Sequence, residues 1–170
     1  MKIVISKEKK FLVKDTSKDF HTKDGMIKSK DFKKSKAKTN KGVEFSIIDP
    51  QFIDIYEKIK RGAQIISLKD IGAIIAETGI NKESKVLDAG SGSGALSCYL
   101  AHIVKEVITY DIEDTAIKTT KENIKFLDLK NIKIKKKNIY KGISEKNLDL
   151  ITLDLKEPWN AIAPAHKALK

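Results

Sequence analysis

The hydrophobic residues beyond position 68 alternate between helical and strand-like spacing. Ile71, Ile74 and Ile75 fall on one helical face, and Gly79 follows as a C-cap residue, because glycine readily adopts the left-handed conformation that ends a helix. Apolar runs typical of strands and helices then follow in turn. The predicted strands are 86–87, 107–110, 132–134 and 148–153, and the predicted helices are 96–103 and 116–127. This order predicts right-handed βαβ units, which form a parallel sheet covered by helices on both faces.

The first 60 residues have a different pattern. Short strand-like runs at 2–5, 11–13, 26–28 and 43–48 are separated by lysine, aspartate, glycine and serine. About 48 residues of this kind are too few for a stable core of their own. A short helical segment is predicted after Pro50, with apolar residues on one face. We therefore predict a small β-rich N-terminal domain over 1–60 and an α/β domain over 61–170.

The composition excludes several classes of protein. The chain is 41% hydrophobic, but no window approaches 18 uninterrupted apolar residues, so no membrane span is expected. The N-terminus is too polar for a signal peptide, which favours an intracellular, cytoplasmic protein. Cys98 is the single cysteine, and the three histidines lack the spacing of metal ligands. Neither an internal disulfide nor a metal site is expected.

The net charge of +11 comes almost entirely from lysine. Residues 28–41 and residues 125–141 each contain seven lysines against a single aspartate. Such charge favours a polyanionic partner, since neutralised phosphates release counterions. A lysine-rich, heat-adapted or merely solvated surface explains it equally well, so charge alone does not decide for nucleic acid.

The most informative motif is DAGSGSGAL, residues 88–96, where the first parallel strand turns into a helix. Gly90 and Gly92 would let the backbone approach a ligand closely, and Gly94 would let helix and strand pack. Dehydrogenases share this glycine pattern. Asp88, however, precedes the first glycine, and a carboxylate there can hold the ammonium of an amino-acid moiety but would repel a pyrophosphate.

Two further polar residues end the following strands. Asp111 lies 21 residues after Gly90 and can accept hydrogen bonds from both ribose hydroxyls of a nucleoside cofactor; its alternative role is a helix N-cap. Together with Asp88, it favours S-adenosylmethionine (SAM) over NAD. Asn138 can accept from an adenine amino group, or can simply be a turn residue.

Four segments resemble the tRNA (adenine-N1)-methyltransferases of bacteria and archaea, which are class I SAM-dependent enzymes. FHTKDG (20–25) resembles a motif of the family's N-terminal β-domain, and RGAQIISLKD (61–70) resembles the segment that crosses the cofactor. DAGSGSGAL resembles the SAM loop. The most specific match is LDLKEPW (153–159), which resembles the active-site motif after the fourth strand.

The resemblance implies a Rossmann-like methyltransferase domain, SAM as cofactor and 1-methyladenosine in the T-loop of tRNA as product. It also implies that the β-rich N-terminal domain helps to hold RNA and that the protein is a homotetramer if the C-terminal part of the fold is present. Beyond the residues already described, the cofactor contacts that it implies are Gln64, Ser91, Ser93, Ala95, Ile112 and Asp154.

The implied reaction needs no nucleophile from the protein. N1 of adenine has a lone pair, so the base has only to be flipped out and aligned with the methyl donor. Asp154, at the end of its strand, would accept from the exocyclic amino group and stabilise developing positive charge as the catalytic residue. Trp159 would form a wall beside the base, or is a core aromatic. Lys133, Lys135, Lys136 and Lys137 are the predicted tRNA contacts.

Two departures from the family keep alternatives open. Ser67 replaces an aromatic residue and Leu68 replaces a proline; Ser67 and Asp70 instead resemble a helix-capping pair. The full fold also needs strands beyond the four counted here, so we expect either a truncated chain or a partner that supplies the sheet edge. The alternatives are a non-catalytic RNA-binding subunit or truncated inactive homologue, and a small-molecule methyltransferase acting, for example, on tetrapyrrole precursors.

Overall fold

A computed structural model describes residues 1–7, 9–62 and 65–170. Gln64, a predicted cofactor contact, lies outside the described residues. The chain divides into two compact units, Met1–Lys58 and Ile59–Lys170. Each is described by itself below. None of the helices in the described part of the chain has the length and apolar character needed to span a lipid bilayer.

The first unit is a small antiparallel β structure. Four strands form a sheet in the order β2-β1-β6-β5, and β3 pairs with β4 as a separate hairpin. Phe32, Phe45 and Ile27 are buried in its core. Its elements are β1 (Lys2–Ile5), β2 (Lys10–Val13), β3 (Phe20–Thr22), β4 (Gly25–Ile27), η1 (Ser29–Lys33), β5 (Lys36–Lys38), β6 (Glu44–Ile48) and α1 (Phe52–Tyr56). The four predicted strands are present, whereas β3 and β5 were missed because each contains only one apolar residue and so shows no strand-like run.

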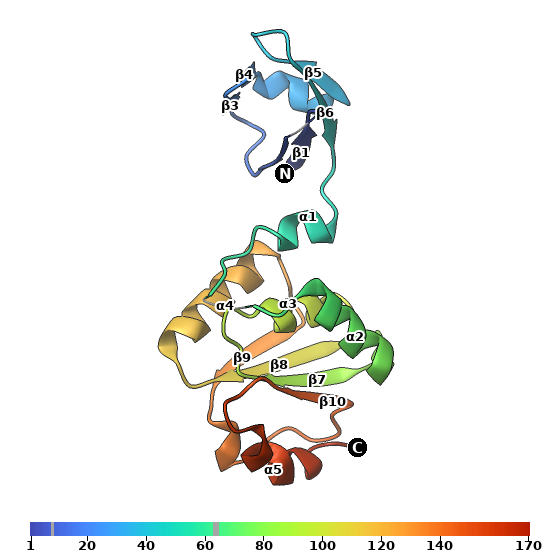
Figure 1. The fold of residues 1–170 in the computed structure, drawn as a ribbon, viewed down its shortest axis with the longest axis vertical. Helices are drawn as coiled ribbons and strands as arrows, with labels where there is room; N and C mark the ends of the chain where they lie inside the picture. The colour runs from blue at the N-terminus through green and yellow to red at the C-terminus, as the bar shows by residue number, and fades with distance from the viewer. Residues whose placement is uncertain (8, 63–64) are drawn as a thin grey trace. The chain divides into compact units, whose positions relative to one another are not determined.

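The second unit is a parallel sheet with helices on both faces, which confirms the predicted fold class. The strand order is β10-β7-β8-β9, with α2, α3 and α4 on one face and α5 on the other (Figure 1). Its elements are α2 (Leu68–Thr78), β7 (Lys85–Ala89), α3 (Ala95–Ala101), β8 (Glu106–Asp111), α4 (Asp114–Phe126), β9 (Ile132–Lys136), η2 (Ile139–Lys141), β10 (Leu150–Leu153), η3 (Pro158–Ala161) and α5 (Ile162–His166).

Local signals set the ends of α2 as the sequence predicts. The Ser67 hydroxyl accepts a hydrogen bond from the Asp70 amide at 3.2 Å, so Ser67 is the N-cap. Gly79 ends the helix in the left-handed conformation with φ +65°. The segment that departs from the family's aromatic-proline pattern therefore starts a well-capped helix.

The two edges of the parallel sheet differ in chemistry. At the β9 edge, Lys133 pairs with Glu106 at 2.9 Å and Lys136 pairs with Asp114 at 2.7 Å. Charged side chains on an edge strand oppose pairing with another strand. At the other edge, Leu169 forms a parallel bridge with Leu148, just before β10. The sequence indicated no strand at Leu169, because a pairing of one residue shows no periodic pattern.

Candidate active site

The carboxyl ends of the four parallel strands meet at one edge of the sheet, where ligands of open α/β folds bind. The glycine loop follows β7, Asp111 ends β8, Asn138 follows β9 and Asp154 follows β10. The structure thus brings together the predicted residues from the four strand ends.

Gly90 allows a close approach between two loops of this edge. Its φ is +91°, and a Cβ atom at this position would lie 2.1 Å from the carbonyl oxygen of Asp154. The Asp154 amide in turn donates to the Ala89 carbonyl at 3.0 Å. The predicted approach of Gly90 to a ligand stays a prediction; what the structure shows is that this glycine makes room for the backbone of the predicted catalytic residue. The glycine loop and Asp154 are therefore fixed against each other.

Gly94 is the N-cap of α3, with φ +75°. A Cβ atom there would lie 2.7 Å from Cγ2 of Thr120, a residue of α4. The predicted close packing is present, but its partner is a neighbouring helix and not a strand. At Gly92, by contrast, a Cβ atom would meet nothing within 4 Å. This part of the loop is open.

The Asp111 carboxylate organises the glycine loop. One oxygen accepts from the Gly92 amide at 3.0 Å and from the Ser91 hydroxyl at 3.1 Å. The other accepts from the amides of Ile112 and Glu113 at 2.7 and 2.9 Å. The N-cap of α4 is Glu113, so Asp111 is not the cap residue itself. Ser93 and Ala95, also predicted cofactor contacts, are buried beneath the loop.

A small pocket of about 70 Å³ opens between the ends of β7, β8 and β9. Asp111, Ile112 and Asn138 line it, and Ile112 is 54% exposed. The Asn138 side chain accepts from the Tyr140 amide at 2.9 Å, so it does have the turn role. Because Asn138 also lines the small pocket, its predicted contact with an adenine amino group stays a prediction. The remaining lining residues are Ala89, Gly90, Tyr110, Lys137, Ile139, Tyr140 and Leu155.

A buried polar network, which the sequence did not reveal, supports one wall of this pocket. The Tyr110 hydroxyl donates to Glu145, and Lys135 pairs with the same carboxylate at 2.5 Å. Burial opposes ionisation of Glu145, but the hydrogen bonds from Lys135, Tyr110 and Ser144 lower its pKa to about 2. Lys137 donates to Ser144 at 3.0 Å, and its ammonium lies 5.2 Å from the centroid of the Tyr110 ring.

This network changes the picture of the four lysines predicted to contact tRNA. Lys133, Lys135 and Lys136 each form an ion pair within the unit, and Lys137 lines the small pocket. Their ammonium groups already have partners, so a phosphate would have to compete for them or share them.

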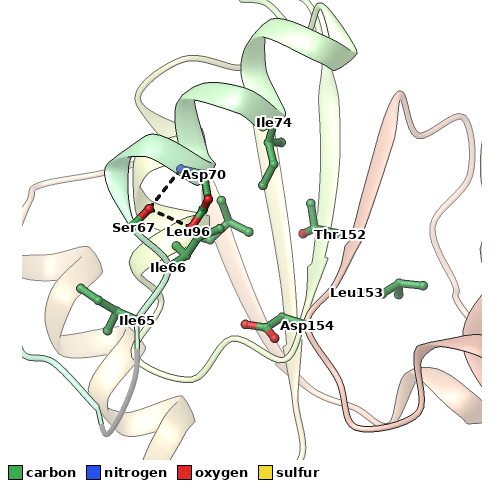
Figure 2. Close-up of a pocket in the computed structure, with 9 residues that line it drawn as sticks. All are labelled: Ile65, Ile66, Ser67, Asp70, Ile74, Leu96, Thr152, Leu153 and Asp154. Atoms are coloured by element: carbon green, nitrogen blue, oxygen red, sulfur yellow. Dashed lines mark hydrogen bonds between the residues drawn. The ribbon is translucent and has the colours of Figure 1, made fainter.

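A second pocket of about 780 Å³ lies between β10 and the segment that precedes α2 (Figure 2). Asp154 and Asp70 bring two carboxylates to it, and the Asp154 side chain points into it whereas Leu153 points away. No lysine or arginine is present among the described lining residues, although the chain carries 34 of them. The pocket therefore suits a cationic or neutral ligand and disfavours a phosphate. The remaining lining residues are Ile65, Ile66, Ser67, Ile74, Leu96 and Thr152.

Asp88 is a buried acid that bonds to a residue of the larger pocket. It is 2% exposed and accepts hydrogen bonds from three hydroxyls: Thr152 at 2.7 Å, Thr109 at 3.3 Å, and Ser97. Burial raises the pKa of its carboxyl group. Asp88 lines neither pocket, whereas Thr152 lines the larger one. Asp88 is therefore linked to this pocket by its hydrogen bond with Thr152, and its predicted contact with the cofactor stays a prediction.

Two residues from the sequence prediction lie away from the pockets. Trp159 is 61% exposed, so it is not a core aromatic, and it lines neither pocket. Cys98 is fully buried in α3, and burial raises the pKa of its thiol to about 12. A buried thiol with a raised pKa is a poor nucleophile, so we assign no catalytic role to Cys98. Among the described residues, no cluster of three histidine, cysteine or acidic side chains could hold a metal ion.

Comparisons with known proteins agree with this geometry. The family model described as "tRNA methyltransferase complex GCD14 subunit" matches residues 56–170. The tRNA (adenine(57)-N(1)/adenine(58)-N(1))-methyltransferase TrmI of Methanocaldococcus jannaschii is 34% identical; the match covers 98% of this chain and 70% of that protein.

Two solved structures share the fold over 99% of this chain. A SAM-dependent O-methyltransferase of Thermotoga maritima has a TM-score of 0.87 and 30% identity, with 67% of its chain covered. The tRNA (m1A58) methyltransferase TrmI of Aquifex aeolicus has a TM-score of 0.82 and 29% identity, with 69% covered. The chain therefore belongs to the tRNA (adenine-N1)-methyltransferase family.

Proposed function

We propose that this chain transfers the methyl group of SAM to N1 of an adenosine in the T-loop of tRNA. The proposal rests on the close main-chain contact between Asp154 and the glycine loop. Asp154 also lines the larger pocket, whose described residues include two carboxylates and no lysine or arginine. The named activities of the archaeal and bacterial relatives support the same reaction.

The residues at the strand ends fit the two halves of SAM. In the small pocket, Asp111 would accept from the ribose hydroxyls, Asn138 would accept from the adenine amino group, and Ile112 and Leu155 would contact the adenine ring. The open backbone at Gly92 leaves room for the ligand beside the loop. The amino-acid half would extend toward the larger pocket, whose acidic lining favours its positive charge. Ser91, Ser93, Ala95 and Gln64 complete the proposed cofactor contacts.

When bound, SAM supplies an electrophilic methyl group on a sulfonium. The lone pair of adenine N1 forms the new carbon–nitrogen bond as the carbon–sulfur bond breaks, which leaves a positive charge on the base. Asp154 is exposed in the larger pocket, so its carboxylate can accept from the exocyclic amino group and offset that charge. Its fixed backbone holds the carboxylate in place before the base arrives.

The rest of the proposal concerns the RNA and the assembly. The β-rich unit and the lysine-rich segments would contact tRNA phosphates, as the local charge of residues 28–41 supports. Trp159, exposed just beyond Asp154 in the chain, would contact the RNA outside the pocket. A homotetramer in the cytoplasm is the assembly that family membership favours. Light scattering of the purified chain measures the oligomeric state directly.

The test is mass spectrometry of nucleosides from an unmodified tRNA transcript incubated with the chain and SAM. We expect 1-methyladenosine with the wild type and with Glu83→Gln, a control that removes an exposed acid lining neither pocket. Asp154→Asn should reduce the methylation rate about 100-fold or more, while the SAM dissociation constant changes only a few-fold. Unchanged turnover of Asp154→Asn would rule out the assignment of that residue.

One observation favours a second function. None of the described residues that line the larger pocket is aromatic, because Ser67 stands where the family often has an aromatic side chain. A pocket without a ring to stack on the target base suits a non-catalytic RNA-binding subunit. That reading predicts tRNA binding without SAM binding, which titration calorimetry with each ligand distinguishes.

A further inference from the structure

We propose that the β-rich unit contains a nucleotide site of its own, which holds one unpaired base of the RNA substrate. The identity of the ligand as RNA rests on the proposed function. The site is a hollow of about 670 Å³ lined by Lys9, Phe11, His21, Thr22 and Lys23, here called the β-unit hollow. Its volume is within the range of about 300 to 1,000 Å³ that is typical of small-ligand pockets.

One side of the β-unit hollow is a rigid hairpin. Thr22 pairs with Gly25 across a turn of only two residues, and the Thr22 hydroxyl donates to the Gly25 carbonyl at 2.9 Å. Gly25 has φ +107°, and a Cβ atom there would lie 2.4 Å from the side-chain oxygen of Asn40. That oxygen accepts from the Met26 amide at 2.9 Å. The hairpin is therefore fixed to the rest of the unit, with Lys23 exposed at its tip.

The other side provides an aromatic surface. Phe11 is half-buried: its ring lies 6.4 Å from the Phe45 ring in the core and 5.6 Å from the Phe20 ring, in an edge-to-face arrangement. These contacts hold the Phe11 ring while it lines the hollow. A base stacks well on a ring that is already fixed, because little side-chain freedom is lost on binding.

The charge around the ring favours a phosphate-bearing ligand. Lys9, His21 and Lys23 line the hollow together with Phe11. The Lys9 ammonium pairs with Asp24 at 2.5 Å, so a phosphate would share it, whereas Lys23 is exposed at the hairpin tip. The lysines of residues 28–41 belong to the same unit. A ring for the base, flanked by cations for the backbone, is the arrangement by which proteins bind single-stranded nucleic acid. Paired bases would not expose a face to the ring, so an unpaired nucleotide is the ligand.

The test measures the binding of the full chain to two fluorescent RNAs of equal length, one unpaired and one a blunt duplex. Phe11→Leu keeps an apolar side chain against the core, and His21→Ala changes an exposed residue. We expect each to weaken binding of the unpaired RNA about 5- to 100-fold, the range of one base–aromatic stack, with little effect on the duplex. Lys9→Gln with Lys23→Gln should act in the same direction.

The matched control is Lys30→Gln with Lys33→Gln, which removes the same charge from exposed positions of the unit. It should weaken both RNAs equally. If the hollow variants keep the wild-type preference for unpaired RNA, or if the control loses that preference to the same extent, the proposal is overturned. A photocrosslink from 5-iodouridine RNA that maps to Phe11 or His21 supports the site even if Phe11→Leu folds poorly.

The outcomes separate this site from the proposed reaction. If the wild type forms no 1-methyladenosine but the hollow variants lose unpaired RNA, the hollow stands and the proposed reaction fails. If methylation occurs and unpaired RNA binds all hollow variants as it binds the wild type, the reaction stands and the hollow fails.

Discussion

Replacing Glu145 by glutamine tests whether its buried ion pair stabilises the wall of the small pocket. Glutamine keeps the shape and can still accept from Lys135 and Tyr110, but it carries no charge. The pKa of Glu145 falls from 4.5 to about 2 on folding. That difference corresponds to roughly 3 kcal/mol of folding free energy at neutral pH. It is an upper value, because the Lys135 side chain is 45% exposed.

The expected loss depends on pH, and its sign follows from the lowered pKa. A carboxylate whose pKa is depressed in the folded state stabilises the fold above its unfolded pKa and loses that effect as pH falls. The cost of Glu145→Gln should therefore be roughly 3 kcal/mol at pH 7, about half of that near pH 3, and smaller still near pH 2. Urea unfolding of both proteins at several pH values measures this difference.

Glu106→Gln is the matched control at the same sheet edge. Hydrogen bonding from Lys133 lowers the pKa of Glu106 too, but its side chain is 29% exposed and Lys133 is 69% exposed. Its loss should stay within about 1 kcal/mol, as is usual for exposed ion pairs. A Glu145→Gln cost that is constant from pH 7 to pH 2, or no larger than that of Glu106→Gln, would refute the reasoning.

Three further predictions follow from the loop and from α3. Gly90→Ala should lower the free energy of unfolding by about 3 kcal/mol or more, because its Cβ meets the Asp154 carbonyl; Gly92→Ala, with open space around it, should cost only about 1 kcal/mol in the same urea titration. Asp111→Asn should weaken SAM binding about 10- to 100-fold by calorimetry while the protein stays folded. Cys98 should resist alkylation by iodoacetamide until denaturant is added; rapid labelling of the native protein would contradict its burial.

Local sequence patterns predicted the parallel sheet well. Neighbouring residues determine the apolar face of α2, its Ser67 N-cap and its Gly79 C-cap. The order of strands and helices also followed from local spacing. The placement of Asp111, Asn138 and Asp154 at one edge followed from the rule that parallel strands end together. These features could be predicted because each depends on short-range spacing or on fold topology.

The features that were missed depend on contacts between residues far apart in the chain. Tyr110 and Glu145 are 35 residues apart, and the Gly90 contact with Asp154 joins residues still farther apart in the sequence. The spacing of hydrophobic residues predicts which face of a helix or strand a residue occupies. It does not identify the residue that it contacts across the sheet. The same limit hid the ion pairs of Lys133, Lys135 and Lys136, because their acidic partners lie elsewhere in the sequence; the predicted RNA contacts of these lysines stay a prediction.

The contact between Gly90 and the Asp154 carbonyl separates what is fixed in this site from what can vary. Two stretches of main chain meet there with no side chain between them, so the spacing between the cofactor loop and the acid does not depend on side-chain identity. The opposite wall of the larger pocket, which includes Ser67, is built from side chains instead. Substitutions in that wall can change which base is accepted while the reacting groups keep their separation. The main-chain contact thus fixes the reacting groups, whereas the side chains of the opposite wall can change and alter which base binds.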